Sequence, residues 1–122
     1  MNSFRACSSE TPVKAVHALR VRELNDSFRT SFRGGRVMLT AGVADLPEVT
    51  RTALLIAVQS FDQFDADNDP YDEHDFGSVE VCGVRAFWKI DPFDLSLNAL
   101  SPDPSDPAVT TRVLTVLLQE EY

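Results

Sequence analysis

Two β-type runs flank Cys82-Gly83 in the segment FGSVEVCGVRAFWKI, Phe76 to Ile90, and they constrain the fold more than any other feature. Runs of this kind separated by two residues are typical of a β-hairpin. Cysteine is not a favoured residue at positive φ, so a type I turn with Gly83 in a bulge is the alternative to a two-residue turn. In both cases the segment is predicted to form a pair of antiparallel strands.

The side chains favour the two-residue turn. It gathers six apolar side chains on one face of the hairpin, which are Val79, Val81, Val84, Ala86, Trp88 and Ile90. A slip of one residue would mix them with Glu80 and His74. In the preferred register the pairing continues outward from the turn until His74 faces Asp91.

Helical periodicity precedes the hairpin. A first helix is expected from Val13 to the two glycines at 34 and 35, because apolar residues recur every three or four positions at Val21, Leu24, Phe28 and Phe32. Another face carries a basic stripe, interpreted as solvated surface, of Arg22, Arg29, Arg33 and Arg36. A second helix is expected after Asp45, where Glu48 completes a capping box and Pro47 suits the first turn, and its apolar face reaches Phe64.

Three further segments complete the expected fold. RVMLTAGV, Arg36 to Val43, and LSLNAL, Leu95 to Leu100, are predicted strands. A last helix is expected from Pro107 to about Glu121, with a core face of Val109, Val113, Val116 and Leu117. Residues 1–12 are polar and are predicted to be a disordered tail. Residues 13–122 are expected to form a single two-layer α+β domain in the order α-β-α-β-β-β-α, with a mainly antiparallel sheet and helices on one face.

Charge is divided unevenly along the chain. Met1 to Arg36 carries seven Lys/Arg and three acids, whereas the rest carries four Lys/Arg and sixteen acids, so a net charge of +4 precedes one of −12. This excess of acid argues against direct binding of nucleic acid, which needs basic groups that displace counterions. An acidic surface can instead attract a basic protein, or occupy a nucleic-acid channel in place of the polyanion. A protein partner is therefore expected, and no direct nucleic-acid binding.

The expected compartment follows from signals that the sequence lacks. No apolar run approaches the roughly 18 to 20 residues that span a bilayer, and the N-terminus has no apolar secretory segment. Cys7 and Cys82 stand in no zinc-binding or redox spacing and are expected to be reduced thiols. We expect a cytoplasmic protein with no membrane association and no cofactor.

The stretch FDADNDPYDEHDFG, Phe64 to Gly77, concentrates carboxylates between the second helix and the hairpin. It opens with the D-x-D-x-D spacing of a calcium loop, but Pro70 stands where that loop needs glycine and Phe76 where it needs glutamate. No dedicated metal site is predicted, only weak binding of a divalent cation as an alternative. The stretch is interpreted as a solvated acidic loop, and its candidate partner-binding residues are Asp65, Asp67, Asp69, Asp72 and Asp75.

A second interpretation treats His74 as a general base. The preferred register sets His74 opposite Asp91, close enough for a hydrogen bond between imidazole and carboxylate. Lys89 or an arginine of the first helix would stabilise an anion, and Glu73 adjoins His74, but no serine or cysteine is near enough to serve as a nucleophile. Such a site would activate water. A purely structural role, in which the His–Asp pair stabilises the hairpin, is the preferred alternative.

Five blocks of the chain carry a resemblance: LNDSFR (24–29), GGRVMLTAGV (34–43), NDPYDEHDFG (68–77), FWKID (87–91) and SPDPSDPAVTTRVLT (101–115). They resemble a small bacterial domain family of unknown function, and the likeness covers nearly everything after the N-terminal tail. The resemblance implies a bacterial accessory protein of the kind found among plasmid- and phage-like genes, and it implies no activity. Two positions depart from the family pattern, because glycine is expected where Asp72 stands and an aromatic residue where Pro92 stands.

Two classes of function are therefore expected. The preferred one is a small acidic accessory protein that binds another macromolecule, for example as an inhibitor of a nucleic-acid-handling system. The other is a hydrolase-like enzyme that uses His74, Asp91, Lys89 and Glu73. The first is preferred because the sequence contains no complete catalytic motif.

Overall fold

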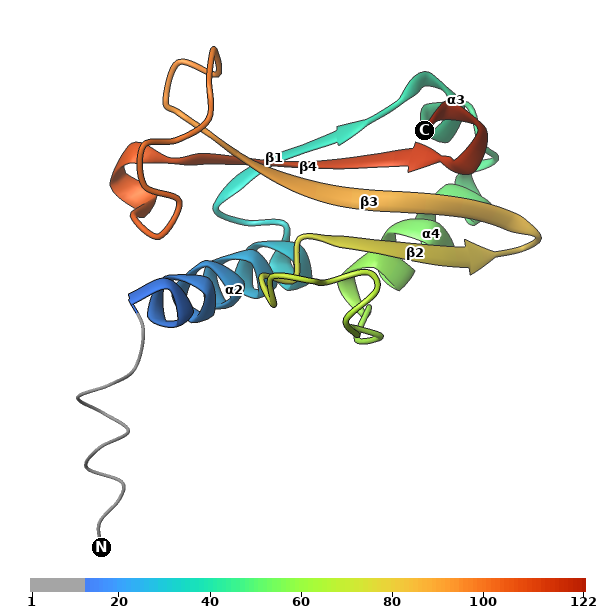
Figure 1. Ribbon diagram of the computed structural model, residues 1–122. Helices are drawn as coiled ribbons and strands as arrows, with labels where there is room; N and C mark the ends of the chain where they lie inside the picture. Colours follow the sequence, from blue (N-terminus) through green and yellow to red (C-terminus); the bar gives the residue numbers. More distant parts are fainter. Residues whose placement is uncertain (1–12) are drawn as a thin grey trace, which may run out of the picture.

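A computed structural model of the chain describes residues 13–122 (Figure 1). The predicted disordered tail, residues 1–12, lies outside the described residues. The helices are α2 (Val13–Ser31), α3 (Ala41–Ala44) and α4 (Glu48–Gln59). The strands are β1 (Gly35–Leu39), β2 (Phe76–Val81), β3 (Val84–Phe93) and β4 (Thr111–Leu118), and two 3-10 turns flank β4, η1 (Pro107–Val109) and η2 (Gln119–Glu121).

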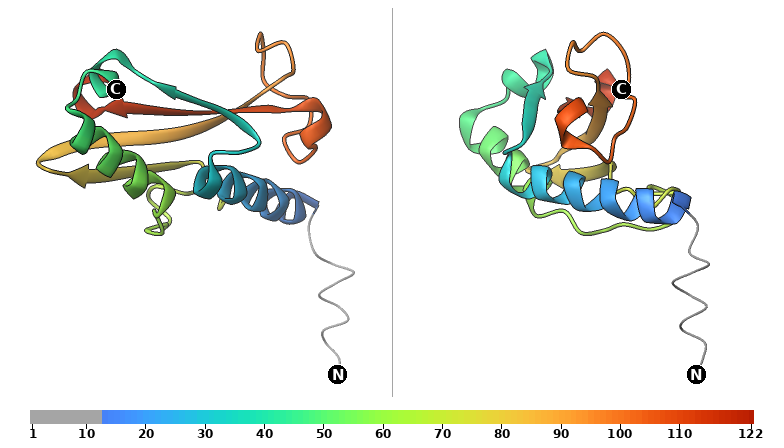
Figure 2. Two further views of the ribbon diagram at one scale, coloured as in Figure 1. Left: turned by 180° about the vertical axis from the view of Figure 1, so that it is seen from behind. Right: turned by 90° about the vertical axis from the view of Figure 1, so that its left-hand side faces the viewer.

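The four strands form one mixed sheet in the order β1-β4-β3-β2. Strands β2, β3 and β4 are antiparallel to their neighbours, and β1 pairs in parallel with β4. Helices α2 and α4 lie along the same side of the sheet, which is visible in both Figure 1 and Figure 2. The predicted α+β class with a mainly antiparallel sheet is therefore confirmed. Within residues 13–122, no helix combines the length and the apolar character needed to cross a bilayer.

The hairpin of β2 and β3 has the predicted register. Val81 pairs with Val84, and the ladder continues without a slip to Phe76 opposite Lys89. Cys82 and Gly83 both have positive φ, 53° and 77°, as a two-residue hairpin turn of the primed type requires. The apolar face of the hairpin packs against α2 and α4, and the largest fully buried side chains of this core are Trp88, Phe28, Leu54, Leu114, Val43, Val58 and Val116.

The predicted last helix is wrong, because Thr111–Leu118 is strand β4. The helix-start signal is real but short: the Asp106 side chain accepts a hydrogen bond from the backbone N–H of Ala108, and a single 3-10 turn follows. Half of the eight β4 residues are β-branched, which favours a strand. Burial then alternates, with Arg112, Leu114 and Val116 buried against the helices. The strands on both sides of β4 satisfy its backbone, and these long-range partners do not appear in a local sequence pattern.

The predicted strand Leu95–Leu100 is also wrong, since this segment is a loop. The Asp94 carboxylate accepts hydrogen bonds from the Ser96 hydroxyl and the Asn98 backbone N–H, at 2.8 and 3.1 Å. Such local bonds compete with strand pairing. Leu97 has a φ of 63°, and only Leu100 makes a bridge, to Phe93.

The predicted strand Arg36–Val43 is too long at its C-terminal end. Strand β1 ends at Leu39, and α3 begins at Ala41. Asp45 ends α3 and does not cap α4, which begins at Glu48 with Pro47 before it. The observed order of elements is therefore α-β-α-α-β-β-β.

Candidate functional site

The acidic stretch forms the loop between α4 and β2, and this loop lies against α2. Three contacts join loop and helix: Arg22 to the Asp72 carboxylate, Asn25 Nδ2 to the Glu73 carbonyl, and Asp26 to His74. The loop carboxylates differ in exposure. Asp65, Asp67 and Asp72 are exposed, Glu73 and Asp75 are half-buried, and Asp69 is buried.

Asp69 organises the loop from inside. It is 7% exposed, and its Oδ1 accepts the backbone N–H groups of Glu73 and His74, at 2.9 and 3.0 Å. Asp72 and His74 have positive φ values of 61° and 54°, which turn the chain toward α2 before the strand begins. A left-handed backbone at position 72 explains why glycine suits this position.

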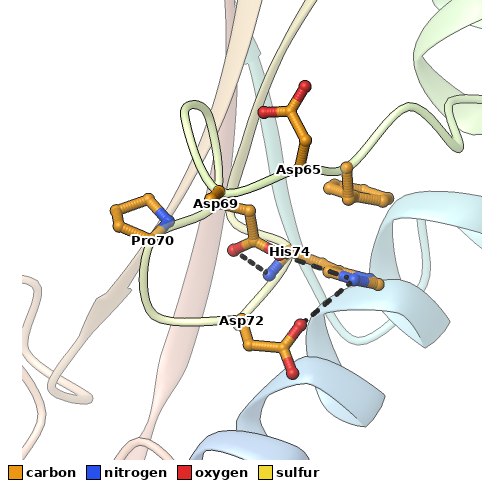
Figure 3. A pocket seen from close by; sticks show the side chains of 7 residues that line it. Asp65, Asp69, Pro70, Asp72 and His74 are labelled. Atoms are coloured by element: carbon orange, nitrogen blue, oxygen red, sulfur yellow. Dashed lines mark hydrogen bonds and ion pairs between the residues drawn. The ribbon is translucent and has the colours of Figure 1, made fainter.

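His74 is held on three sides. Its Nδ1 lies 2.9 Å from Asp26 Oδ1, and its ring stacks on Phe64 with centroids 3.7 Å apart. Its Nε2 faces the other way, 3.5 Å from Asp69 Oδ2 and 4.0 Å from Asp72 Oδ1 (Figure 3). Because a carboxylate only accepts hydrogen bonds, the contact with Asp26 requires a proton on Nδ1, and Nε2 faces the loop carboxylates.

The predicted pair of His74 and Asp91 is wrong, because the two side chains have other partners. His74 pairs with Asp26 of α2 because the chain leaves the sheet at Asp75, whose carbonyl accepts the last cross-strand bond, from the Ile90 N–H. Asp91 instead forms an ion pair with Lys89 at 3.1 Å, on its own strand. The four predicted catalytic residues are thus divided between a His74 group and a Lys89–Asp91 pair, with Glu73 next to His74.

Arg29 is buried beneath the site, and its assignment to a solvated basic stripe is wrong. The Arg29 side chain is 4% exposed, donates to the carbonyl oxygens of Val58 and Phe61 at 3.1 and 3.0 Å, and pairs with Asp26. Its guanidinium also lies over the rings of Trp88 and Phe64. Arg29 therefore satisfies one carbonyl group in the last turn of α4 and one just after α4, and it positions Asp26, which positions His74.

Two loop carboxyl groups are poorly solvated. Burial raises the pKa of Glu73, the nearby Asp75 and Asp69 raise it further, and Arg112 opposes them. Burial also raises the pKa of Asp75, to which Asp69 and Asp91 add, although a hydrogen bond to its own backbone and His74 favour the charged form. Negative charge is therefore crowded where the loop joins β2.

A pocket of about 340 Å³ opens beside His74, lined by Phe64, Asp65, Ala66, Asp69, Pro70, Asp72 and His74 (Figure 3). Four carboxylates lie in or next to it, from Asp26, Asp65, Asp69 and Asp72, and two guanidinium groups oppose them, from Arg22 and Arg29. Counting the carboxylates and guanidinium groups alone, four negative and two positive charges leave an excess of two negative charges. This arrangement suits a cationic group.

Within the described part of the chain, one set of side chains has ligand atoms close enough to share a metal ion. It consists of Asp69, Asp72 and His74, whose ligand atoms lie within 4.8 Å of one another. The calcium-like spacing itself does not converge on one centre. Asp65 Oδ1 accepts the N–H groups of Asp67 and Asn68 and so closes its own turn, and Asp65 points away from His74 (Figure 3).

Comparison with known proteins gives a family and no activity. The sequence model of a family described as "Protein of unknown function (DUF3768)" matches residues 39–121, more than half of the chain. The chain belongs to the DUF3768 family. No curated protein and no solved structure matches the chain significantly. The DUF3768 match covers α4, the acidic loop and the whole hairpin, whereas α2, which supplies Asp26 and Arg29, precedes it.

Three residues that build the site were not identified as site residues from the sequence: Asn25, Asp26 and Arg29. A signal was present, because Asn25 and Arg29 are four positions apart and lie together beside the face that holds Val21, Phe28 and Phe32. Polar side chains among apolar ones on a core face are satisfied inside the protein. The sequence could have indicated buried polar contacts here, but not their partners.

Proposed function

We propose that this DUF3768 protein works by binding another macromolecule, and that its acidic pocket receives a lysine or arginine side chain of a basic protein. The observation that carries the proposal is the pocket itself, in which the carboxylates of Asp69 and Asp72 converge beside His74. Charge-assisted hydrogen bonds to carboxylates are about twice as strong as neutral ones. The aromatic ring of Phe64 adds a surface on which the apolar stem of such a side chain packs.

Exposure narrows the partner-binding surface to part of the predicted set. Asp65, Asp67 and Asp72 are accessible to a partner, whereas Asp69 holds the loop together through two backbone N–H groups. Asp75 lies half-buried just before β2 and is the least suited to contact a partner. A partner would therefore meet Asp65 and Asp72 at the rim of the pocket and Asp69 at its base, with Asp67 exposed on the same loop outside the pocket.

The first test uses short peptides that carry one arginine between glycines, with citrulline in place of arginine as the neutral control of the same shape. NMR titration should move the amide signals of Asp65, Asp69, Asp72 and His74 with the arginine peptide only. Equal shifts with both peptides would remove charge recognition from the proposal. Binding should weaken as salt increases, because the rim charges are exposed.

Matched variants locate the binding. Asp72→Asn and Asp65→Asn remove pocket charges while keeping an acceptor oxygen, and Asp45→Asn makes the same charge change at an exposed position outside the pocket. We expect the two pocket variants to lose binding and Asp45→Asn to retain it. If all three weaken binding equally, the effect comes from net charge and the pocket is not the site.

A narrower form of this proposal specifies the role of the protein in the cell. The excess of acid after Arg36 and the family resemblance support a cytoplasmic bacterial accessory protein, from plasmid- or phage-like genes, that inhibits a nucleic-acid-handling system. In this version the acidic loop occupies a basic channel in place of nucleic acid. Affinity capture of a nucleic-acid-binding protein, with release by single-stranded or duplex DNA and loss in Asp65→Asn/Asp72→Asn, would support it. A captured partner that DNA does not displace would exclude the inhibitor version.

A hydrolase-like function is the second candidate, and the contact between Asp26 and His74 favours it. A carboxylate that orients an imidazole through Nδ1 leaves Nε2 as a general base for water. Asp26 takes the role that the sequence assigned to Asp91. Turnover of phosphoester or carboxylic ester substrates that His74→Gln abolishes and Asp26→Asn reduces would establish it. Equal turnover by the parent and His74→Gln would eliminate it.

A further inference from the structure

A second pocket lies on the opposite flank of α2. It has a volume of about 140 Å³ and is lined by Leu24, Ser27, Phe28, Arg33, Gly34, Pro107, Thr110 and Arg112. At 100° per residue, Leu24 and Ser27 point away from Arg22 and Asp26, which face the acidic loop. No carboxylate lines this second pocket, and two arginines do. Its charge is therefore opposite to that of the pocket at His74.

Arg112 is the unusual residue of this pocket. It opens toward the pocket from the start of β4 and is only 3% exposed. Its Nε donates to Asn25 Oδ1 at 2.8 Å, and its Nη2 donates to the Pro104 carbonyl. Within residues 13–122, no carboxylate comes within ion-pair distance of Arg112, and its Nη1 has no hydrogen-bond acceptor. A buried charge is costly unless an opposite charge matches it.

The electrostatic surroundings agree with an unmatched charge. Burial lowers the pKa of Arg112, the positive charge of Arg20 lowers it further, and Glu73 opposes them from a distance. Two more donors face the same space. Across the described residues, the Arg33 guanidinium and the Ser27 hydroxyl have no partner, since Ser27 accepts bonds only at its carbonyl and Arg33 donates only from its backbone.

We propose that this pocket binds a small oxyanion, a carboxylate or a phosphate group, between Arg112 at its base and Arg33 at its rim. The planar guanidinium fork of arginine matches both groups. Ser27 supplies a further hydrogen-bond donor, while Leu24 and Phe28 form an apolar wall for the carbon atoms next to the anion. The proposal does not depend on the acidic pocket, because the two pockets share no lining residue.

The test compares sodium phosphate and sodium acetate with sodium chloride at equal ionic strength, using the whole chain. Phosphate or acetate should raise the melting temperature above that in chloride and should shift the NMR signals of Ser27, Arg33 and Thr110. A preference for phosphate identifies a phosphoryl ligand, and a preference for acetate identifies a carboxylate. If neither anion exceeds chloride, the proposal is wrong.

Variants of exposed residues keep the test independent of folding. Arg33→Gln should weaken binding of the preferred anion about tenfold, because one charged hydrogen bond is lost. Ser27→Ala should weaken it less. Arg85→Gln, which removes an exposed arginine on the hairpin outside the pocket, is the matched control and should bind as the parent does. Equal weakening in Arg33→Gln and Arg85→Gln would overturn the proposal, as would unchanged binding in Arg33→Gln.

Discussion

Two buried arginines lie on the two flanks of α2, and they are satisfied in different ways. Arg29 has an ionic partner in Asp26 and two carbonyl acceptors near the end of α4. Arg112 has an amide and one carbonyl as acceptors and no carboxylate partner among the described residues. A charge that is matched within the fold needs no ligand, whereas an unmatched one marks a place where a ligand would be stabilised. The comparison thus separates a structural arginine from one suited to binding.

The largest expected effect comes from replacing each arginine by methionine. Arg29→Met should lower the free energy of unfolding by about 3 kcal/mol, because it leaves two carbonyl oxygens and Asp26 without their cation. Arg112→Met should cost about 1 kcal/mol, since the loss of two hydrogen bonds is offset by removal of an unmatched buried charge. Urea denaturation measures both values. A larger loss for Arg112→Met than for Arg29→Met would reverse the roles assigned to the two residues.

A smaller effect is expected at the crowded carboxyl groups of the acidic loop. The pKa values of Glu73 and Asp75 are raised in the folded protein, so the unfolded chain releases these protons first as the pH rises, and folding is penalised at neutral pH. Asp75→Asn and Glu73→Gln should therefore stabilise the protein at pH 7, by less than about 1 kcal/mol because both groups keep part of their hydration.

The pH dependence of this stabilisation tests whether the ionised carboxylates oppose folding. The gain should disappear as the pH falls below the ordinary values of 4.5 for glutamate and 3.8 for aspartate, because each group is then protonated in both the folded and the unfolded state. Thermal denaturation of parent and variants between about pH 2.5 and about 7 would follow the loss of this gain. Destabilisation at pH 7 would mean that the ionised carboxylates have favourable partners, and the contrast between the acidic flank and the Arg112 flank would then be weaker.

The smallest expected effect is that of Asp72→Gly. Glycine relieves the left-handed backbone at position 72, and the variant loses the ion pair with Arg22, which is largely exposed on the Asp72 side. These contributions oppose each other, so the free energy of unfolding should change by no more than about 0.5 kcal/mol. Binding of the arginine peptide should nevertheless weaken. Unchanged binding would show that Asp72 belongs to the loop structure alone and would weaken the contrast between the two flanks.

The hairpin and the amphipathic core face of α2 could be predicted because their signals are local. Alternation around Cys82-Gly83 fixes the register, and spacings of three and four place Val21 and Phe28 on one face. The segment Thr111–Leu118 was different. Its apolar spacing fits a helix over a short window, but its β-branched residues favour a strand and its two partner strands, β1 and β3, stabilise that strand.

The candidate site was predicted in part. His74 and the acidic loop were identified from their composition, but the partner of His74 was wrong. Two residues with positive φ, Asp72 and His74, turn the chain out of the sheet, and Asp69 stabilises that turn from a buried position. A register extended from the hairpin cannot contain this turn. Likewise, the carbonyl groups that hold Arg29 inside lie about 30 residues further along the chain, beyond the reach of helical periodicity.

The central place of β4 has a consequence for the order in which the molecule can assemble. It is the last strand in the sequence, yet it separates β1 from β3, and β1 has no other neighbour in the sheet. During synthesis, β1 would have to wait for Thr111–Leu118 before its backbone groups could pair. Strand β1 is therefore made early but is among the last to form its backbone hydrogen bonds. Its unpaired edge is the place where a nascent chain would depend on chaperones to prevent aggregation.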